Sequence, residues 1–187
     1  MPESPQIPPP LAKQKKEGLI IVHTGNGKGK TTAALGLAIR AVGQKMKVLI
    51  VQFIKGKWHY GEMETAKLLK PYLEIYAMGE GFTWDTQNRE RDIQKAREAF
   101  EFGLDKIKDG DYDMLIFDEI NYVTSYQYLP VDEVVQFLKK KPKKLHVVLT
   151  GRDVDPRVIE IADLVTEMKE IKHPYQKGIK AQKGIEF

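Results

Sequence analysis

The chain has 187 residues, of which 42% are hydrophobic and 30% are charged, which favours one compact domain with a buried core and excludes wholesale disorder. Lys and Arg (30) slightly outnumber Asp and Glu (26), so the net charge is +4. The absence of cysteine excludes disulfides, thiolate metal sites, iron–sulfur clusters and a cysteine nucleophile. No apolar run approaches the roughly 18 residues of a transmembrane helix, so we expect no membrane partner.

The first segment, residues 1–17, is proline-rich and then carries several lysines. It lacks the apolar core of a secretory signal, and the simplest expectation is a cytoplasmic protein. We expect this segment to be either a flexible leader or an arm that closes over a ligand or a partner subunit. Residues 18–187 contain no visible repeat or linker and are expected to form a single domain.

Short apolar runs alternate with helical patterns along residues 18–187. Most of the runs are rich in Val, Ile and Leu without strict polar alternation, which is typical of strands covered on both faces. The expected strands are 19–23, 48–53, 73–77, 114–117, 145–149 and 164–168, and the expected helices are 30–42, 86–108, 132–138 and one beginning at Pro156. This alternation predicts an α/β fold of three layers, with a mainly parallel sheet of about six strands.

A glycine-rich loop lies between the first expected strand and the first expected helix. Its spaced glycines allow successive backbone N–H groups to converge on one anion, and the helix N-terminus adds partial positive charge. Lys30 is expected to reach the terminal phosphates of a nucleotide, and the Thr31 hydroxyl to ligate Mg²⁺. The alternative is a glycine-rich turn without a ligand. The predicted ATP-binding residues of this loop are Gly25, Asn26, Gly27, Lys28, Gly29, Lys30, Thr31 and Thr32.

Two acids, Asp118 and Glu119, directly follow the apolar run 114–117. They are expected at the carboxyl edge of the sheet, where ligands bind in open α/β folds. Either acid, directly or through water, would complete a Mg²⁺ site with Thr31, although an acid at a strand end can also simply cap a turn. Arg152 follows the fifth expected strand and is a further candidate for phosphate binding. The four histidines show no ligand spacing, and we assign none of them to a metal.

These motifs alone leave the reaction open. An ATPase or kinase would use Glu119 to orient a water or substrate. A nucleotide-dependent nucleic-acid-binding module would use the lysines gathered at 139–144 and near the C-terminus. However, no lysine stripe alternates with aromatic residues, and the 139–144 cluster fits a solvated helix end, where positive charge complements the helix dipole.

The combined motifs resemble the ATP:corrinoid adenosyltransferase family of the phosphate-loop type. The resemblance extends from about residue 18 to the C-terminus. Besides the phosphate loop, it is carried by the segments 51–56 (VQFIKG), 79–84 (GEGFTW), 118–121 (DEIN), 149–152 (LTGR), 173–175 (HPY) and 181–187 (AQKGIEF). The segment 79–84 and the C-terminal segment discriminate this family best, because many nucleotide-binding proteins share the phosphate loop.

The resemblance implies that the reduced cobalt(I) of a corrinoid attacks the 5′-carbon of ATP and that triphosphate leaves. Lys30, Mg²⁺ and the loop amides would stabilise the leaving group, with Glu119 serving the metal. Phe82 and Trp84 would lie beneath the corrin and help displace the lower axial ligand of cobalt. The family also implies a reduced flavoprotein as electron donor and a homodimer. Cobalamin, cobinamide and other corrinoids remain equal candidates for the substrate.

Overall fold

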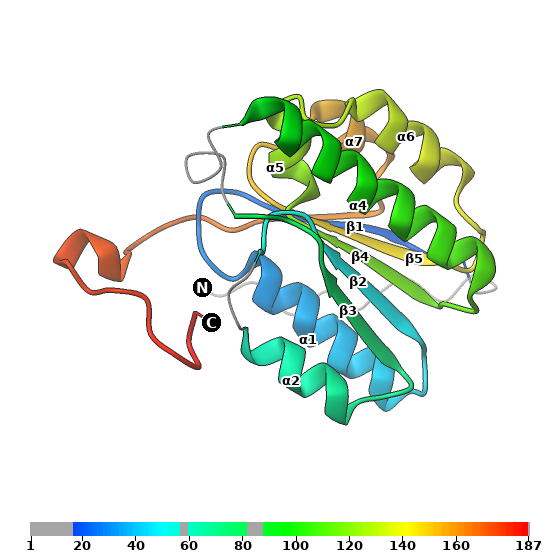
Figure 1. The fold of residues 1–187 in the computed structure, drawn as a ribbon, viewed down its shortest axis with the longest axis horizontal. Helices are drawn as coiled ribbons and strands as arrows, with labels where there is room; N and C mark the ends of the chain where they lie inside the picture. The colour runs from blue at the N-terminus through cyan, green and yellow to red at the C-terminus, as the bar shows by residue number, and fades with distance from the viewer. Residues whose placement is uncertain (1–16, 57–59, 82–87, 187) are drawn as a thin grey trace, which may run out of the picture.

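The computed structural model describes residues 17–56, 60–81 and 88–186. It contains a six-stranded sheet in the order β3-β2-β4-β5-β1-β6, in which every neighbouring pair is parallel (Figure 1). The strands are β1 (Ile20–Thr24), β2 (Val48–Gln52), β3 (Leu73–Ala77), β4 (Met114–Asp118), β5 (His146–Thr150) and β6 (Leu164–Glu167). Each expected strand is present, with its ends shifted by at most one residue. The predicted α/β class and parallel sheet are therefore confirmed.

Helices cover both faces of the sheet, which gives the three layers expected from the sequence. One face carries α1 (Lys30–Gly43) and α2 (Gly61–Leu68). The other carries α4 (Arg89–Asp109), α5 (Ile120–Ser125), α6 (Val131–Lys140) and α7 (Pro156–Ile161). The short helices α2 and α5 were not predicted, because neither is long enough to show a clear helical period. None of the helices in the described ranges is both long and apolar enough to cross a membrane.

The central strands send alternate side chains into two separate hydrophobic clusters. In β4, Leu115 and Phe117 pack toward α4 and α6, whereas Met114 and Ile116 pack toward α1. All four are at most 6% exposed. Burial on both faces explains why these strands read as continuous apolar runs without polar alternation.

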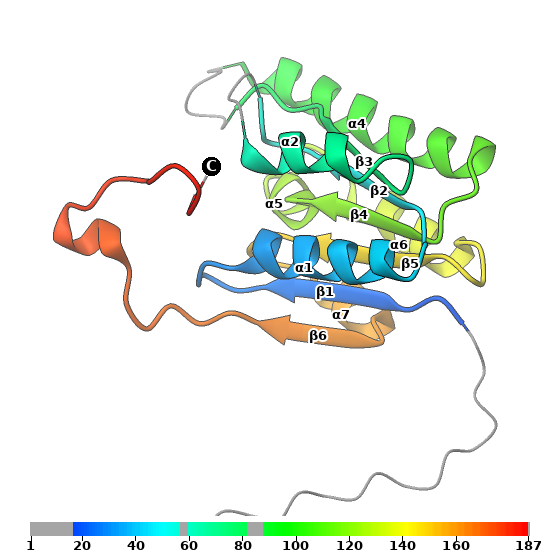
Figure 2. The same cartoon turned by 90° about the horizontal axis from the view of Figure 1, so that it is seen from below.

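The edge strand β6 differs from the central strands, because all of its residues are exposed. Leu164 and Val165 are 48% and 39% exposed. Beyond β6, residues 169–186 leave the sheet and run past its carboxyl edge, with only the short 3₁₀ helix η1 (Pro174–Lys177) along the way (Figure 2). The burial on both faces that the sequence indicates for most of the strands therefore does not extend to this edge strand.

The topology brings the loops of interest to one edge of the sheet. The helix that follows β1 covers one face, and the helices that follow β4 and β5 cover the other. Connections therefore diverge to opposite faces at the carboxyl ends of neighbouring strands, which is where open α/β sheets form ligand crevices. The predicted phosphate loop follows β1 and the two acids lie at the end of β4, so both open onto this edge.

Candidate active site

The glycine-rich loop packs tightly against the residue that follows β6. The Gly27 N–H donates to the carbonyl of Met168 at 2.6 Å. A Cβ at Gly25 or Gly27 would lie 2.5 or 2.7 Å from that carbonyl oxygen, which is closer than real side chains approach. Gly25 also has a φ of +92°, a conformation that favours glycine. These two glycines therefore serve the packing of the loop as well as any ligand.

Lys30 places its ammonium group inside the curve of this loop. Its Nζ donates to the carbonyls of Gly25 at 2.8 Å and Gly27 at 2.9 Å, and the residue is only 8% exposed. Burial lowers the pKa of the Lys30 ammonium, while the negative charge of Glu119 opposes that shift. A buried cation held by carbonyl oxygens is well placed to exchange these partners for an anionic ligand.

Thr31 and Asp118 meet across the sheet edge although they are far apart in the sequence. The Thr31 hydroxyl donates to Oδ1 of Asp118 at 2.8 Å. The same carboxylate oxygen accepts a second hydrogen bond, from the Thr150 hydroxyl at the end of β5, also at 2.8 Å. Asp118 is 1% exposed, so these donors provide the hydrogen bonds that its buried charge requires.

The second carboxylate oxygen of Asp118 faces polar side chains from β2, from the segment after β2 and from α2. Gln52 Nε2 lies 3.3 Å from Oδ2 of Asp118 and 3.3 Å from Oε1 of Glu62. Lys55 Nζ forms an ion pair with Glu62 and lies 4.0 Å from the same Asp118 oxygen. The pKa of the Glu62 carboxyl is lowered: burial opposes the shift, but hydrogen bonding and attraction to Lys55 outweigh it.

Glu119 turns the chain from β4 into α5 with a left-handed backbone, φ +66°. Burial, and then the adjacent Asp118 carboxylate, raise the pKa of Glu119 to about 7. The positive charges of Lys30 and Arg152 oppose this rise, so these groups lie within electrostatic reach of one another. The predicted residues Lys30, Asp118, Glu119 and Arg152 thus gather at one edge of the sheet.

Other predicted loop residues lie at the rim of this cluster. Asn26, Thr32 and Lys28 are exposed. Lys28 forms an ion pair with Glu186 near the C-terminus, which brings the end of the chain back to the loop. Within the described ranges, no three His, Asp or Glu side chains gather as a ready-made metal site.

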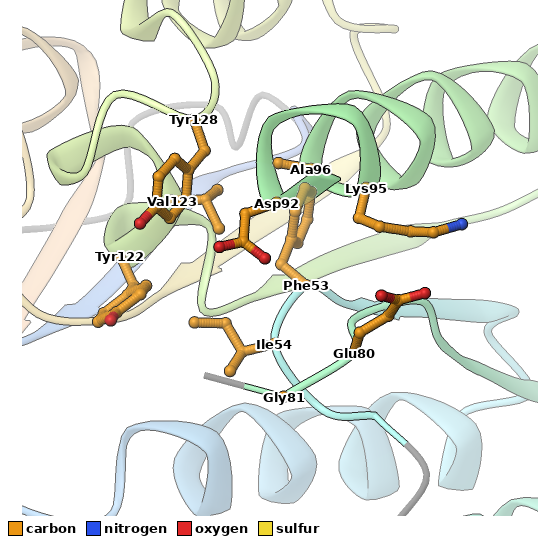
Figure 3. Close-up of a pocket in the computed structure, with 10 residues that line it drawn as sticks. All are labelled: Phe53, Ile54, Glu80, Gly81, Asp92, Lys95, Ala96, Tyr122, Val123 and Tyr128. Carbon is orange, nitrogen blue, oxygen red and sulfur yellow. The ribbon is translucent and has the colours of Figure 1, made fainter. Parts of the chain in front are cut away.

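The predicted corrinoid-binding residues Phe82 and Trp84 lie outside the described residues. The described segment that precedes them ends at Gly81. This glycine lines a small pocket formed by the loop after β3 together with α4 and α5 (Figure 3). Phe53, Tyr122 and Tyr128 supply aromatic walls, and Figure 3 shows that these residues come from the segment after β2, from α5 and from the segment after α5. The pocket has a volume of about 20 Å³, enough for a water molecule and far too small for a nucleotide.

Three residues that contact this site were not among those predicted from the sequence: Thr150, Gln52 and Met168. Thr150 and Gln52 each end an apolar strand that neighbours β4, and this position was the available signal, because parallel strands end at the same sheet edge. Met168 gave no such signal. Its contact with the phosphate loop uses the backbone carbonyl, which is common to every residue type.

The family model described as ATP:corrinoid adenosyltransferase BtuR/CobO/CobP matches residues 16–187. The chain belongs to this family. A corrinoid adenosyltransferase of Escherichia coli strain K12 is 48% identical over 93% of this chain and 88% of its own length. One from a Sinorhizobium species is 50% identical over 94% of this chain and 83% of its own length.

Among solved structures, the flagellar accessory protein FlaH of Methanocaldococcus jannaschii aligns with a TM-score of 0.52. The alignment covers 81% of this chain and 71% of FlaH, at 18% sequence identity. At this identity, the likeness concerns the fold alone. It agrees with the α/β fold that the sequence predicted.

Proposed function

We propose that this protein transfers the 5′-deoxyadenosyl group of ATP to the cobalt(I) of a corrinoid and releases triphosphate, in adenosylcobalamin synthesis or salvage. Membership of the adenosyltransferase family over nearly the whole chain supports this activity. The observation that carries it within the molecule is the hydrogen bond from Thr31 to the buried Asp118, beside Lys30 in the phosphate loop. This pairing joins a nucleotide loop to a carboxylate at the same sheet edge.

The site residues fit Mg²⁺ bound together with ATP. The Thr31 hydroxyl donates a hydrogen bond to Asp118, which leaves the lone pairs of the threonine oxygen free to bind a cation. Mg²⁺ prefers oxygen ligands and usually retains waters and substrate phosphates in its coordination sphere. Thr31, with Asp118 or Glu119 directly or through water, would hold it. When bound, the ion supplies positive charge that offsets the developing charge of triphosphate.

The proposed chemistry needs positioning and charge stabilisation from the protein. The cobalt(I) electron pair forms the bond to the 5′-carbon, and the electrons of the broken C–O bond leave with triphosphate. The nucleophile belongs to the substrate, so no activated serine, cysteine or general base is required. Lys30 and the loop amides would bind the phosphates and stabilise the leaving group, and Lys28 and Arg152 would add positive charge at the rim.

Other parts of the proposal rest on the family resemblance. Phe82 and Trp84 would contact the corrinoid from below, and a reduced flavoprotein would deliver the electron. A homodimer is also proposed, and the C-terminal segment supports it. Four large apolar side chains of that segment are 46–80% exposed, as expected of a surface that a second subunit covers: Ile171, Tyr175, Ile179 and Ile185.

Product identity tests this function directly. Purified protein is incubated with MgATP and chemically reduced cob(I)alamin, and the products are separated by chromatography. We expect adenosylcobalamin and triphosphate in equal amounts. Recovery of ADP and orthophosphate without adenosylcobalamin would refute the transferase and favour an ATPase or kinase. Salt-sensitive nucleic-acid binding without corrinoid-dependent ATP consumption would instead favour the nucleic-acid-binding module.

A further inference from the structure

Thr150 joins the two strands on which the site is built. It is the last residue of β5 and is fully buried, with 0% exposure. Its hydroxyl donates to Oδ1 of Asp118 at 2.8 Å and accepts from the backbone N–H of Glu119, also at 2.8 Å. One side chain therefore holds both members of the acidic pair.

The direction of these hydrogen bonds follows from simple proton accounting. A threonine hydroxyl has one proton and two lone pairs. Because the Glu119 N–H can only donate, the proton of Thr150 is directed at the Asp118 carboxylate. The Thr31 hydroxyl donates to the same oxygen at 2.8 Å. With Oδ1 held by two donors and Oδ2 facing the more distant Gln52 amide at 3.3 Å, the carboxylate plane has little freedom to rotate.

The contact with Glu119 secures an unfavourable backbone conformation. Glu119 has a φ of +66°, which is uncommon for a residue with a side chain. β4 ends at Asp118, and the Thr150 hydroxyl supplies a hydrogen-bond acceptor for the next N–H. A second hydrogen bond links the same two segments, because Asn121 Nδ2 in α5 donates to the carbonyl of Gly151, directly after β5, at 3.3 Å. The start of α5 is thus fixed to the end of β5.

From this geometry, we propose that Thr150 is a positioning residue of the Mg²⁺–nucleotide site, acting through Asp118 and Glu119. Groups that orient metal ligands from behind typically alter metal affinity by about 10- to 100-fold when they are removed. The inference rests on the proposed binding of Mg²⁺ and ATP. Thr150 itself is placed behind the carboxylates and acts through them.

Two substitutions separate the hydroxyl from the rest of the side chain. Thr150→Val keeps the branched shape but removes both hydrogen bonds, whereas Thr150→Ser keeps the hydroxyl and removes the methyl group. Thr124→Val serves as the matched control, because its hydroxyl donates to the backbone carbonyl of Asn121 and to neither acid. Binding of a fluorescent, non-reactive ATP analogue is measured with EDTA and across a Mg²⁺ titration, and folding is checked by thermal melting.

We expect Thr150→Val to raise the Mg²⁺ concentration at half-saturation by at least about tenfold, with analogue binding in EDTA changed less than about twofold. Thr150→Ser and Thr124→Val should stay within about threefold of the unmodified protein. Equal losses with and without Mg²⁺, or a serine variant as impaired as the valine variant, would overturn the positioning role. So would a valine variant that binds Mg²⁺ normally.

Two further results keep the test decisive. If Thr150→Val does not fold, hydrogen exchange in the unmodified protein replaces it: the Glu119 amide should be protected, and rapid exchange at that amide would overturn the proposal. The unmodified protein also separates this inference from the function on which it rests. Analogue binding that is indifferent to Mg²⁺ would refute the proposed metal site itself.

Discussion

Replacing Gly27 with alanine tests whether the phosphate loop depends on its contact with the segment after β6. An added Cβ would lie 2.7 Å from the carbonyl oxygen of Met168 and under 3.0 Å from two more backbone atoms. Neither side of the contact can rotate away as a side chain would. The loop must therefore shift, which stretches the 2.6 Å hydrogen bond between the Gly27 N–H and Met168.

The expected destabilisation combines two effects. Overpacking costs about 1–3 kcal/mol, and weakening one backbone hydrogen bond adds about 1 kcal/mol. A total of about 2–4 kcal/mol corresponds to a fall in melting temperature of roughly 5–15 °C for a chain of this size. Binding of an ATP analogue should weaken as well, because the displaced loop supplies the proposed phosphate ligands.

Gly36→Ala provides the matched control. Gly36 lies within α1, and an added Cβ there meets nothing within 4 Å. Alanine should raise the free energy of unfolding by about 0.5–1 kcal/mol, because glycine is a poor helix former. Thermal melting and analogue binding are measured for both variants. A Gly27→Ala protein that melts and binds like the unmodified chain would refute the argument that this contact shapes the loop.

The remaining predictions concern charge. Lys30→Met should lower kcat/KM for adenosyl transfer by about 10²- to 10³-fold, because the positive charge that would stabilise the leaving triphosphate is lost. The control Lys139→Met removes an exposed charge in the last turn of α6 and should leave kcat/KM unchanged. Equal effects of the two substitutions would contradict the role of Lys30. Burial lowers the pKa of His23 below its ordinary 6.5. The unfolded chain therefore binds the proton more readily, and the free energy of unfolding should fall as the pH drops through about 6.5 and below. Denaturant titrations of the unmodified protein and His23→Gln between pH 5 and 8 should show a weaker decline in the variant, and parallel curves would exclude His23 as a cause. Glu186→Gln removes the partner of the Lys28 ion pair, so the freed positive charge should tighten ATP-analogue binding up to about fivefold. The effect should be clearest at low salt, where charges are least screened. Weaker binding would mean that the ion pair supports the site.

The sequence by itself determined which segments form strands and approximately where each strand begins and ends. In β2 and β4, burial on both faces requires apolar residues at nearly every position, so each strand appears as an uninterrupted apolar run. The phosphate loop and the two acids were also visible, because glycines between a strand and a helix, and charges after a buried strand, depart sharply from their surroundings.

Only the tertiary structure decided which strands are neighbours and which side chains share a site. Strand order places β5 between β1 and β4, so that Thr150 reaches Asp118 and Glu119. The contact of Met168 with the loop uses a backbone carbonyl, and the exposed strand β6 lies at the edge of the sheet, where it has one neighbour. Such features depend on long-range pairing, whereas local sequence patterns report only how each segment is buried.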